Sequence, residues 1–221
     1  FEDLLYQIRR QPGAQSSQNT QLPSGLQVGT GVRVIGTQKE FSAGSVDVTE
    51  KPLDISIDGR GFFEILLPDG TAAYTRNGQF QINAEGEIVN SRGLVLQPAI
   101  TVPAEAQGVT ISSDGIVEAT LAGQAATQNL GTLQVTNFVN PTGLQAVGSN
   151  LFVETAASGS PQAGTPGTQG LGSIEQGALE NSNVDVVEEL VNMITTQRTY
   201  EMNSKVISTA DQMLQFVSQN L

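Results

Sequence analysis

Apolar and polar residues alternate along much of the chain, and this period of two is typical of half-buried β-strands. Between Leu26 and Ile57 the apolar residues come in short alternating runs, such as Val46 and Val48. Many of them are β-branched, and β-branched side chains favour strands over helices. The pattern therefore predicts a mainly β structure for this region of the chain.

Turn signals divide the stretch that follows into short strands. A polar residue is followed by glycine at Gly70, Gly78, Gly86 and Gly93, and glycine supplies the positive φ that tight hairpin turns need. The strand-like runs around these turns are Phe62–Leu67, Ala72–Arg76, Phe80–Asn83, Ile88–Asn90 and Leu94–Gln97. Short strands at this spacing predict an antiparallel β-meander or a barrel-like domain. Another hairpin is expected at Asp114-Gly115, and further strands at Leu130–Phe138 and Leu151–Val153.

The last segment has a different pattern. From Val184 to about Gln219 there is no Gly or Pro, and apolar residues recur at steps of three or four, which predicts a helix of ~50 Å at 1.5 Å per residue. Ser182 and Asp185 have the spacing of a capping box. The residues expected to form a narrow assembly stripe are Val187, Leu190, Ile194, Tyr200, Ile207, Leu214 and Val217. Such a stripe favours a partner helix; the alternative is packing on the β-domain.

The segments on either side of the β-domain are harder to interpret. Phe1–Arg10 has room for two amphipathic helical turns, and the uncharged Gln11–Gly25 is typical of an extended loop. Ala156–Gly172 contains five Gly and two Pro without a charge, so it is either a linker or a long surface loop. We therefore expect three domains: an N-terminal segment (residues 1–30), a β-rich domain (residues 31–172) and a helical segment (residues 173–221). Because the first residue is Phe rather than Met, we also expect a natural start upstream of Phe1.

Composition excludes several functions. The chain has no Cys and no His, which removes thiol nucleophiles, Ser-His-Asp triads and zinc sites built from thiolates or imidazoles. The formal net charge of −12 disfavours binding to nucleic acid, whose phosphates are also negative. No apolar run is long enough for membrane insertion. We expect no enzyme activity, no metal and no cofactor.

The remaining candidates for chemistry are weak. Asp54, Ser56 and Asp58 resemble the start of a calcium loop, but the twelfth position, which needs a bidentate Glu, is Ile65. Gly29-Thr30-Gly31 lacks the third glycine of a dinucleotide fingerprint.

Two further candidates concern glycans. Glu64 and Asp69 are carboxylates of the kind that glycosidases pair, although an acidic protein offers many such pairs. Phe62, Phe63, Tyr74 and Phe80 have the residue types of a sugar-stacking platform, but alternate positions in strands are more typical of core.

Two motifs resemble the rod and hook family of bacterial flagellar axial proteins. The first runs through Ile57–Phe63 (Ile-Asp-Gly-Arg-Gly-Phe-Phe), Pro68–Thr71 and Tyr74–Phe80. The second runs from Gln176 through Glu180 and Asn183–Asp185 into Glu188–Ile194, Gln197, Arg198, Tyr200, Glu201 and Asn203–Lys205. The resemblance covers essentially the whole chain, and within the family it is nearest to the distal-rod members.

The resemblance implies a fold and a mechanical function. The β-domain would be inserted in a discontinuous helical coiled-coil domain, in which an N-terminal helix preceding Phe1 pairs with the C-terminal one. The segment from Tyr6 to Pro23 resembles an insertion of distal rods that lies between subunits of a straight, stiff tube. Its expected contact residues are Tyr6, Arg10, Pro12, Gln15, Leu22 and Pro23.

The resemblance implies that the chain polymerises into a rigid drive shaft that carries motor torque to the hook. The implied partners are further copies of the chain, proximal rod proteins, the hook protein, the P- and L-ring proteins and the type III export apparatus. The implied location is the basal body, from periplasm to outer membrane. The alternatives are a hook or proximal rod subunit or, from another class, a cell-wall glycan-binding or glycan-cleaving β-protein.

Overall fold

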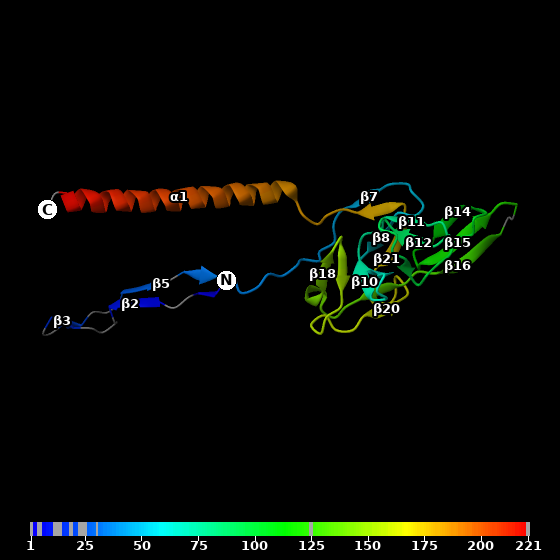
Figure 1. Ribbon diagram of the computed structural model, residues 1–221, viewed down its shortest axis with the longest axis horizontal. Coiled ribbons are helices and arrows are strands. Elements are labelled where there is room, and N and C mark those ends of the chain that lie inside the picture. Colours follow the sequence, from blue (N-terminus) through cyan, green and yellow to red (C-terminus); the bar gives the residue numbers. More distant parts are fainter. Residues whose placement is uncertain are drawn as a thin grey trace. The chain divides into compact units, whose positions relative to one another are not determined.

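The computed structural model describes residues 2–3, 6–10, 15–17, 20–21, 26–29, 31–123 and 126–219. The chain divides into two compact units, residues 1–40 and residues 41–221. The described elements are antiparallel β-strands, one short 3₁₀-helix and one long α-helix (Figure 1). The prediction of a mainly β protein with a long C-terminal helix is confirmed.

The described residues of the first unit form three nested antiparallel strand pairs. They are β1 (Glu2–Asp3) with β6 (Val32–Arg33), β2 (Tyr6–Arg10) with β5 (Leu26–Gly29), and β3 (Gln15–Ser17) with β4 (Thr20–Gln21). The predicted helix at Phe1–Arg10 is therefore wrong where residues are described. So short a helix is marginal by itself, whereas a strand has its backbone groups paired by the partner strand.

The predicted loop Gln11–Gly25 is also corrected in part, because β3 and β4 pair within it. Of the residues expected between subunits, Tyr6, Arg10 and Gln15 lie in β2 and β3. The other three, Pro12, Leu22 and Pro23, lie outside the described residues.

The second unit contains the remaining elements. Its strands are β7 (Val46–Val48), β8 (Ile55–Asp58), β9 (Phe63–Leu66), β10 (Ala72–Thr75), β11 (Phe80–Ile82), β12 (Ile88–Asn90), β13 (Leu96–Gln97), β14 (Ala106–Ile111), β15 (Ile116–Leu121), β16 (Thr127–Thr132), β17 (Val135–Asn137), β18 (Gln145–Gly148), β19 (Leu151–Val153), β20 (Gln162–Gly164), β21 (Ser173–Gln176) and β22 (Ala178–Glu180). The helices are η1 (Pro141–Gly143), which is 3₁₀, and α1 (Val186–Gln219).

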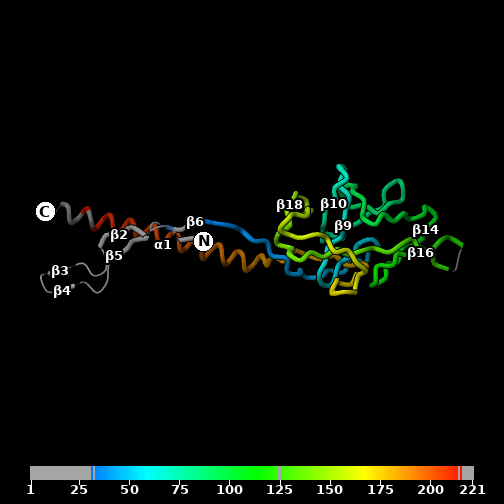
Figure 2. The backbone as a smooth tube through the Cα atoms, turned by 90° about the horizontal axis from the view of Figure 1, so that it is seen from below, coloured from blue at the N-terminus to red at the C-terminus, as the bar shows by residue number. Residues whose placement is uncertain are grey.

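These strands form open antiparallel sheets, not a closed barrel. The largest has the order β13-β9-β10-β19-β18, and β14-β15-β16 forms a second sheet at one end of the β-rich body (Figure 2). Two-stranded ribbons join β11 to β12, β17 to β20, β8 to β21 and β7 to β22. The last two pairings bring the first two strands of the unit together with the two strands that precede α1.

The hairpins predicted around Gly70, Gly86 and Gly115 are confirmed, but the continuous meander is not. β9 pairs with β10 and β11 pairs with β12, while β19 takes the place beside β10 that a meander would give to β11. The difference begins at Gly78, whose carbonyl accepts a hydrogen bond from the Ile55 N–H at 3.0 Å. The chain therefore crosses to β8 after β10 instead of turning back along it.

The β-rich body has an apolar interior. One cluster gathers buried side chains from most of its strands, including Ile55, Phe63, Ile65, Val117 and Val135. A second is aromatic in character and consists of Phe62, Tyr74, Phe138 and Leu144, with Phe41 and Phe152 packed against it. The sheets are thus stabilised by their own core.

The Gly- and Pro-rich segment Ala156–Gly172 is a surface loop and not a linker. Within it, β20 pairs with β17, and the Ser158 and Pro166 side chains are buried. The next eight residues, 173–180, form β21 and β22, which pair with β8 and β7. The strands of the β-rich body thus continue to Glu180, eight residues past the expected boundary at Gly172. The expected division into three domains stays a prediction.

The helix α1 begins at Val186, two residues after the predicted start at Val184, and has a different cap. The Asp185 carboxylate accepts hydrogen bonds from the Val187 and Glu188 N–H groups at 2.9 and 3.3 Å. Ser182 accepts instead from the Val184 N–H, before the helix. Asp185 is therefore the N-cap, and Glu188 and Glu189 follow in the first turn, where negative charge favours the helix dipole.

Candidate assembly surfaces

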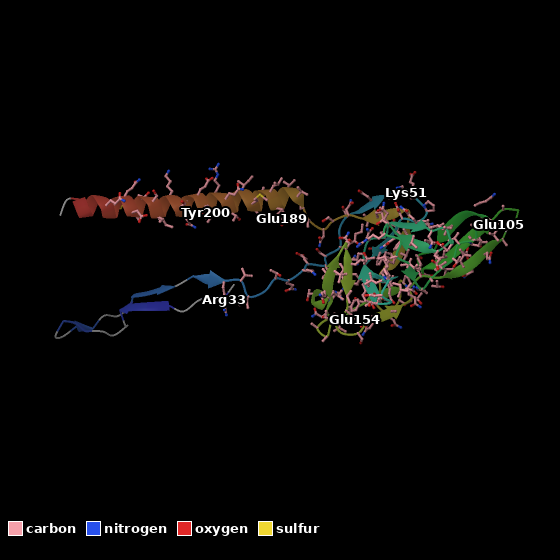
Figure 3. The ribbon with its side chains drawn as sticks, viewed as in Figure 1. Arg33, Lys51, Glu105, Glu154, Glu189 and Tyr200 are labelled. Atoms are coloured by element: carbon pink, nitrogen blue, oxygen red, sulfur yellow. The ribbon has the colours of Figure 1, made fainter. Side chains whose placement is uncertain are left out.

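The helix α1 exposes large apolar side chains. All of its described side chains are exposed, including Leu190 at 51%, Ile194 at 55% and Ile207 at 64%. Figure 3 shows them standing out around the helix, with Tyr200 labelled near its middle. Of the predicted stripe, the side chains of Leu214 and Val217 lie outside the described residues. So much exposed apolar surface on a monomer is typical of an interaction site.

The described apolar side chains of α1 follow a line that drifts around the helix. Val186, Met193, Tyr200 and Ile207 recur every seven residues, and at about 100° per residue each lies about 20° further around the axis than the one before it. The other described apolar side chains lie on one side of this line in the N-terminal half (Val187, Leu190, Val191 and Ile194) and on the other side in the C-terminal half (Met202, Val206, Ala210 and Met213). The assembly stripe expected from the sequence stays a prediction.

A belt of polar side chains surrounds Tyr200 in the middle of α1. The hydroxyls of Thr195, Thr196 and Thr199 each donate to the carbonyl four residues earlier at 2.8 Å. Arg198 and Glu201 form an ion pair of 3.4 Å on this belt, at 75% and 66% exposure. An exposed pair of this kind contributes little stability. The hydroxyls of this belt are thus satisfied within the helix.

Arg76 braces the β-rich body from inside the first sequence motif. Its Nε donates to the Glu180 carboxylate at 2.7 Å, and its two terminal nitrogens donate to the carbonyls of Ile57, Gly59 and Gly61 at 2.9 to 3.1 Å. Glu180 also accepts from the Gly44 N–H at 3.0 Å. One guanidinium thus fixes the loop between β8 and β9 to β22.

Gln176 is a second brace and comes from the C-terminal motif. Its side-chain amide donates to the carbonyls of Pro52 and Val109 at 2.7 and 2.9 Å, and its oxygen accepts from the Ile111 N–H at 3.1 Å. It joins β21 to β14 and to the segment before β8. Sequence reasoning missed the roles of Gln176, Arg76 and Glu180, although all three lie in the quoted motifs; their contacts span 15 to 136 residues.

The residues considered for chemistry have structural roles. Asp54 is buried and accepts from the Thr49 hydroxyl at 2.7 Å. Glu64 lies in β9, whereas Asp69 lies in the exposed turn after it, where the Thr71 N–H donates to its carboxylate and lowers its pKa. No group of three or more acidic side chains among the described residues could hold a metal ion.

The aromatic residues form core, not a glycan platform. Phe62, Phe63, Tyr74 and Phe80 are each at most 3% exposed. Tyr74 packs edge to face on Phe138, with ring centroids 4.7 Å apart. Burial, and then the charges of Glu64 and Glu154, raise the pKa of Tyr74 to about 12. A phenol in this environment stays neutral over the physiological range.

Two hollows of about 400 and 420 Å³ open on the β-rich body, and both are lined by Pro52 and Val109. Glu85 lines the first, and Glu50 and Lys51 line the second. Each lining offers a single carboxylate, whereas glycoside hydrolysis uses two that face each other. In the described residues of the chain, no helix is both long and apolar enough to cross a membrane.

Comparison with known proteins agrees with this arrangement. Residues 56–119 match the family model of the flagellar hook protein FlgE/F/G D1 domain, and residues 175–220 match that of the flagellar basal body rod FlgEFG protein C-terminal region. The first match covers the Arg76 environment, and the second covers Gln176, Glu180 and the whole of α1.

Several relatives share one name. The chain is 51% identical to the flagellar basal-body rod protein FlgG of Buchnera aphidicola subsp. Schizaphis graminum, over 99% of this chain and 84% of the relative. It is 49% identical to FlgG of Caulobacter vibrioides over the same shares. Identity to FlgG of Bacillus subtilis is 41%, over 79% of this chain and 67% of the relative.

Proposed function

Because the chain belongs to the family of flagellar basal-body rod proteins FlgG, we propose that it is a rod subunit that polymerises into the distal rod. The polymer would be a straight, hollow drive shaft that transmits motor torque to the hook. The role is structural and involves no catalysis by this chain.

The observation that carries this proposal is the contrast between the β-rich body and the helix of the second unit. The β-rich body buries an apolar core and braces its signature loops internally through Arg76 and Gln176. The helix α1 leaves its described apolar side chains exposed along an element of 34 residues. Burying one such side chain is worth roughly 1.5–3 kcal/mol, so α1 gains much from a partner.

A tube of subunits supplies such partners. In the proposed arrangement α1 packs with helices of its own and neighbouring subunits in an inner tube, and the β-rich bodies lie outside. Close-packed helices deform little under load, which suits a shaft that transmits torque. The ribbon of β2 and β5 contributes contacts between subunits, as proposed for Tyr6, Arg10 and Gln15 from sequence.

The further partners follow from a place in the basal body. We propose contacts with proximal rod proteins at one end, the hook protein at the other, the P- and L-ring proteins around the shaft, and the type III export apparatus during delivery. The proposed location runs from the periplasm to the outer membrane.

A chimera tests the rod function. The Caulobacter relative, with its aligned residues replaced by this chain, is expressed in cells that lack the relative. We expect swimming, and isolated basal bodies with a straight rod in electron micrographs. A matching chimera built from the Agrobacterium fabrum relative, which is 42% identical to this chain, controls for tolerance of foreign sequence. Non-motile cells without rods, beside a functional control, would overturn the proposal.

A further inference from the structure

Asn77 and Gly78 form the one Asn-Gly dipeptide of the sequence, and they lie where the chain leaves β10 and crosses to β8. In a flexible chain this dipeptide loses ammonia readily, because glycine puts no side chain in the way of ring closure. We propose that Asn77 is a site of spontaneous conversion to isoaspartate, that the folded turn suppresses the reaction, and that the fold rejects the modified chain. The inference goes beyond the rod function and does not depend on it.

The reaction needs only the two residues and water. The Gly78 backbone nitrogen gives its proton to water or hydroxide and attacks Cγ of the Asn77 side chain. A bond forms between this nitrogen and Cγ, the bond from Cγ to Nδ2 breaks, and Nδ2 takes a proton from water and leaves as ammonia. Water then opens the resulting five-membered succinimide. Cleavage of the new bond gives aspartate, and cleavage of the original peptide bond gives isoaspartate.

The fold holds Gly78 where this attack is blocked. Gly78 is buried, so its N–H has little contact with the water or hydroxide that would take its proton. Its carbonyl accepts a hydrogen bond from the Ile55 N–H at 3.0 Å, and the Ile55 carbonyl oxygen lies where a Cβ on residue 78 would be. The Gly78 backbone therefore turns toward the Asn77 side chain only when the crossover to β8 opens.

Asn77 is exposed, but hydrogen bonds hold it at two points. Its Oδ1 accepts from the Gln79 N–H at 3.1 Å, and its own N–H donates to the Thr75 hydroxyl at 3.1 Å. Gln79 in turn pairs with Asp54 in an isolated antiparallel bridge. Moving Cγ onto the Gly78 nitrogen breaks the contact with Gln79. The reaction rate in the folded protein is therefore set by the small population in which this turn is open.

The two products have different effects on the fold. Aspartate keeps the length of the main chain and offers Gln79 the same carboxylate-type acceptor. Isoaspartate carries the main chain through Cβ and Cγ, which inserts one additional backbone atom before Gly78. The crossover has no room for that atom, since even a Cβ on Gly78 would meet the Ile55 carbonyl. The displacement also falls directly after Arg76, which braces the β-rich body.

This difference makes position 77 an irreversible record of time spent unfolded. A chain that folds promptly is protected, whereas a chain that stays unfolded accumulates isoaspartate and loses the crossover from β10 to β8. In the proposed rod, chains that fold too slowly would be kept out of the polymer.

Incubating the full chain under two conditions tests the protection. The chain is held at mildly alkaline pH, either folded or unfolded in urea. Peptide mapping by mass spectrometry, with fragmentation that distinguishes isoaspartate from aspartate, follows position 77. We expect modification to be at least about tenfold faster in urea than in the folded protein. Equal rates would overturn the protection, and a lack of isoaspartate at position 77 in urea would overturn the site.

The matched control is Asn77→Gln, which keeps the amide but lengthens the side chain by one methylene, so that closure to a five-membered ring is no longer possible. This variant should show no modification of the same peptide in urea. If the signal persists in the variant, it arises from another residue, and the assignment to Asn77 is overturned.

Refolding tests the different effects of the two products. A partly modified sample is diluted out of urea, and size-exclusion chromatography separates folded from aggregated protein. We expect isoaspartate at position 77 to be enriched in the aggregate, and asparagine and aspartate in the folded fraction. Asn77→Asp should refold like the parent chain, because the main chain keeps its length. Equal shares of isoaspartate in the two fractions would overturn the claim that the fold rejects it.

Discussion

At the scale of single residues, the motifs shared with the rod family are explained by internal contacts. Arg76 is 19% exposed in its side chain and Glu180 is 10% exposed, so their ion pair is shielded from water. Removing one partner of such an interior ion pair costs more free energy of unfolding than the pair contributes net, because the other charge is left buried without a partner. These residues hold the scaffold on which the assembly surfaces are mounted.

Substituting Arg76 should destabilise the β-rich body. Arg76→Met leaves Glu180 and the carbonyls of Ile57, Gly59 and Gly61 short of their donor, and we expect a loss of roughly 3 kcal/mol in the free energy of unfolding. Urea unfolding followed by circular dichroism measures it.

The matched control is Arg92→Met, because the exposed Arg92 side chain donates to the Ser149 hydroxyl, at 2.7 Å, and joins no buried group. It should change stability by less than about 0.5 kcal/mol. Equal midpoints for the two variants would contradict the bracing role.

Tyr74 should make the protein sensitive to alkali. Its pKa of about 12 exceeds the ordinary value of 10.0, so the folded state holds the phenolic proton more tightly than the unfolded state does. The stabilisation is complete below pH 10 and is lost as the pH rises through about 12. Chemical denaturation between pH 9 and 12 measures this, and Tyr74→Phe should lose less stability over that range. Parallel curves for the two proteins would refute the assignment.

The turn role that the sequence predicts for four glycines is confirmed at three of them. Gly70, Gly86 and Gly93 have φ of +82°, +86° and +78°, so the predicted turn role is confirmed there. Gly78 does not share this positive φ, and a Cβ on it would meet the Ile55 carbonyl oxygen. Glycine is needed at position 78 because the backbone of Ile55 approaches it closely. Ile55 lies 23 residues earlier in the chain, so a local sequence pattern does not reveal this contact.

At the scale of elements, the helix cap can be tested directly. Asp185→Ala removes the acceptor for the Val187 and Glu188 N–H groups and should cost the helix about 1 kcal/mol. Ser182→Ala, at the residue that the capping-box spacing suggested, should cost less, because Ser182 bonds before the helix. Thermal melts at 222 nm compare them; a larger loss for Ser182→Ala would restore the predicted cap.

Elements with strong local signals were predicted well. Hydrophobic periodicity and turn residues alone are enough to predict the helix after Val184, the hairpins around Gly70 and Gly86 and the strands near Gly115. The N-terminal strands were missed because β2 finds its partner β5 beyond an intervening segment of mixed composition, so its pairing is not visible in residues 1–10.

At the scale of the whole molecule, the order of the strands depends on long-range pairings that the sequence pattern does not reveal. β19 lies beside β10, and β21 and β22 return to β8 and β7 across more than a hundred residues. These pairings depend on the shared core and on the Arg76 and Gln176 braces, which have no periodic signature. Family resemblance pointed to the rod function without them, because it rests on ordered motifs and not on topology.

The N-terminal ribbon gives the last prediction, on the stiffness of the assembled rod. Deleting residues 6–23 removes β2, β3 and β4 but leaves β5 without its partner, and an unpaired strand edge invites aggregation. Deleting residues 6–29 removes β5 as well and keeps the β1–β6 pair. In the Caulobacter chimera we expect the longer deletion to give rods that assemble but bend, measured as curvature in electron micrographs of isolated basal bodies.

A third variant separates ribbon length from ribbon presence. Removing residues 15–21 takes away β3 and β4 while β2 and β5 stay paired, so the curvature should lie between that of the parent and that of the longer deletion. In the proposed tube the ribbon would stiffen the rod by contacts with neighbouring subunits, so we expect stiffness to fall as paired strand is lost. Straight rods in all three deletions would show that the ribbon carries no load, and stiffness would then have to come from the packing of α1.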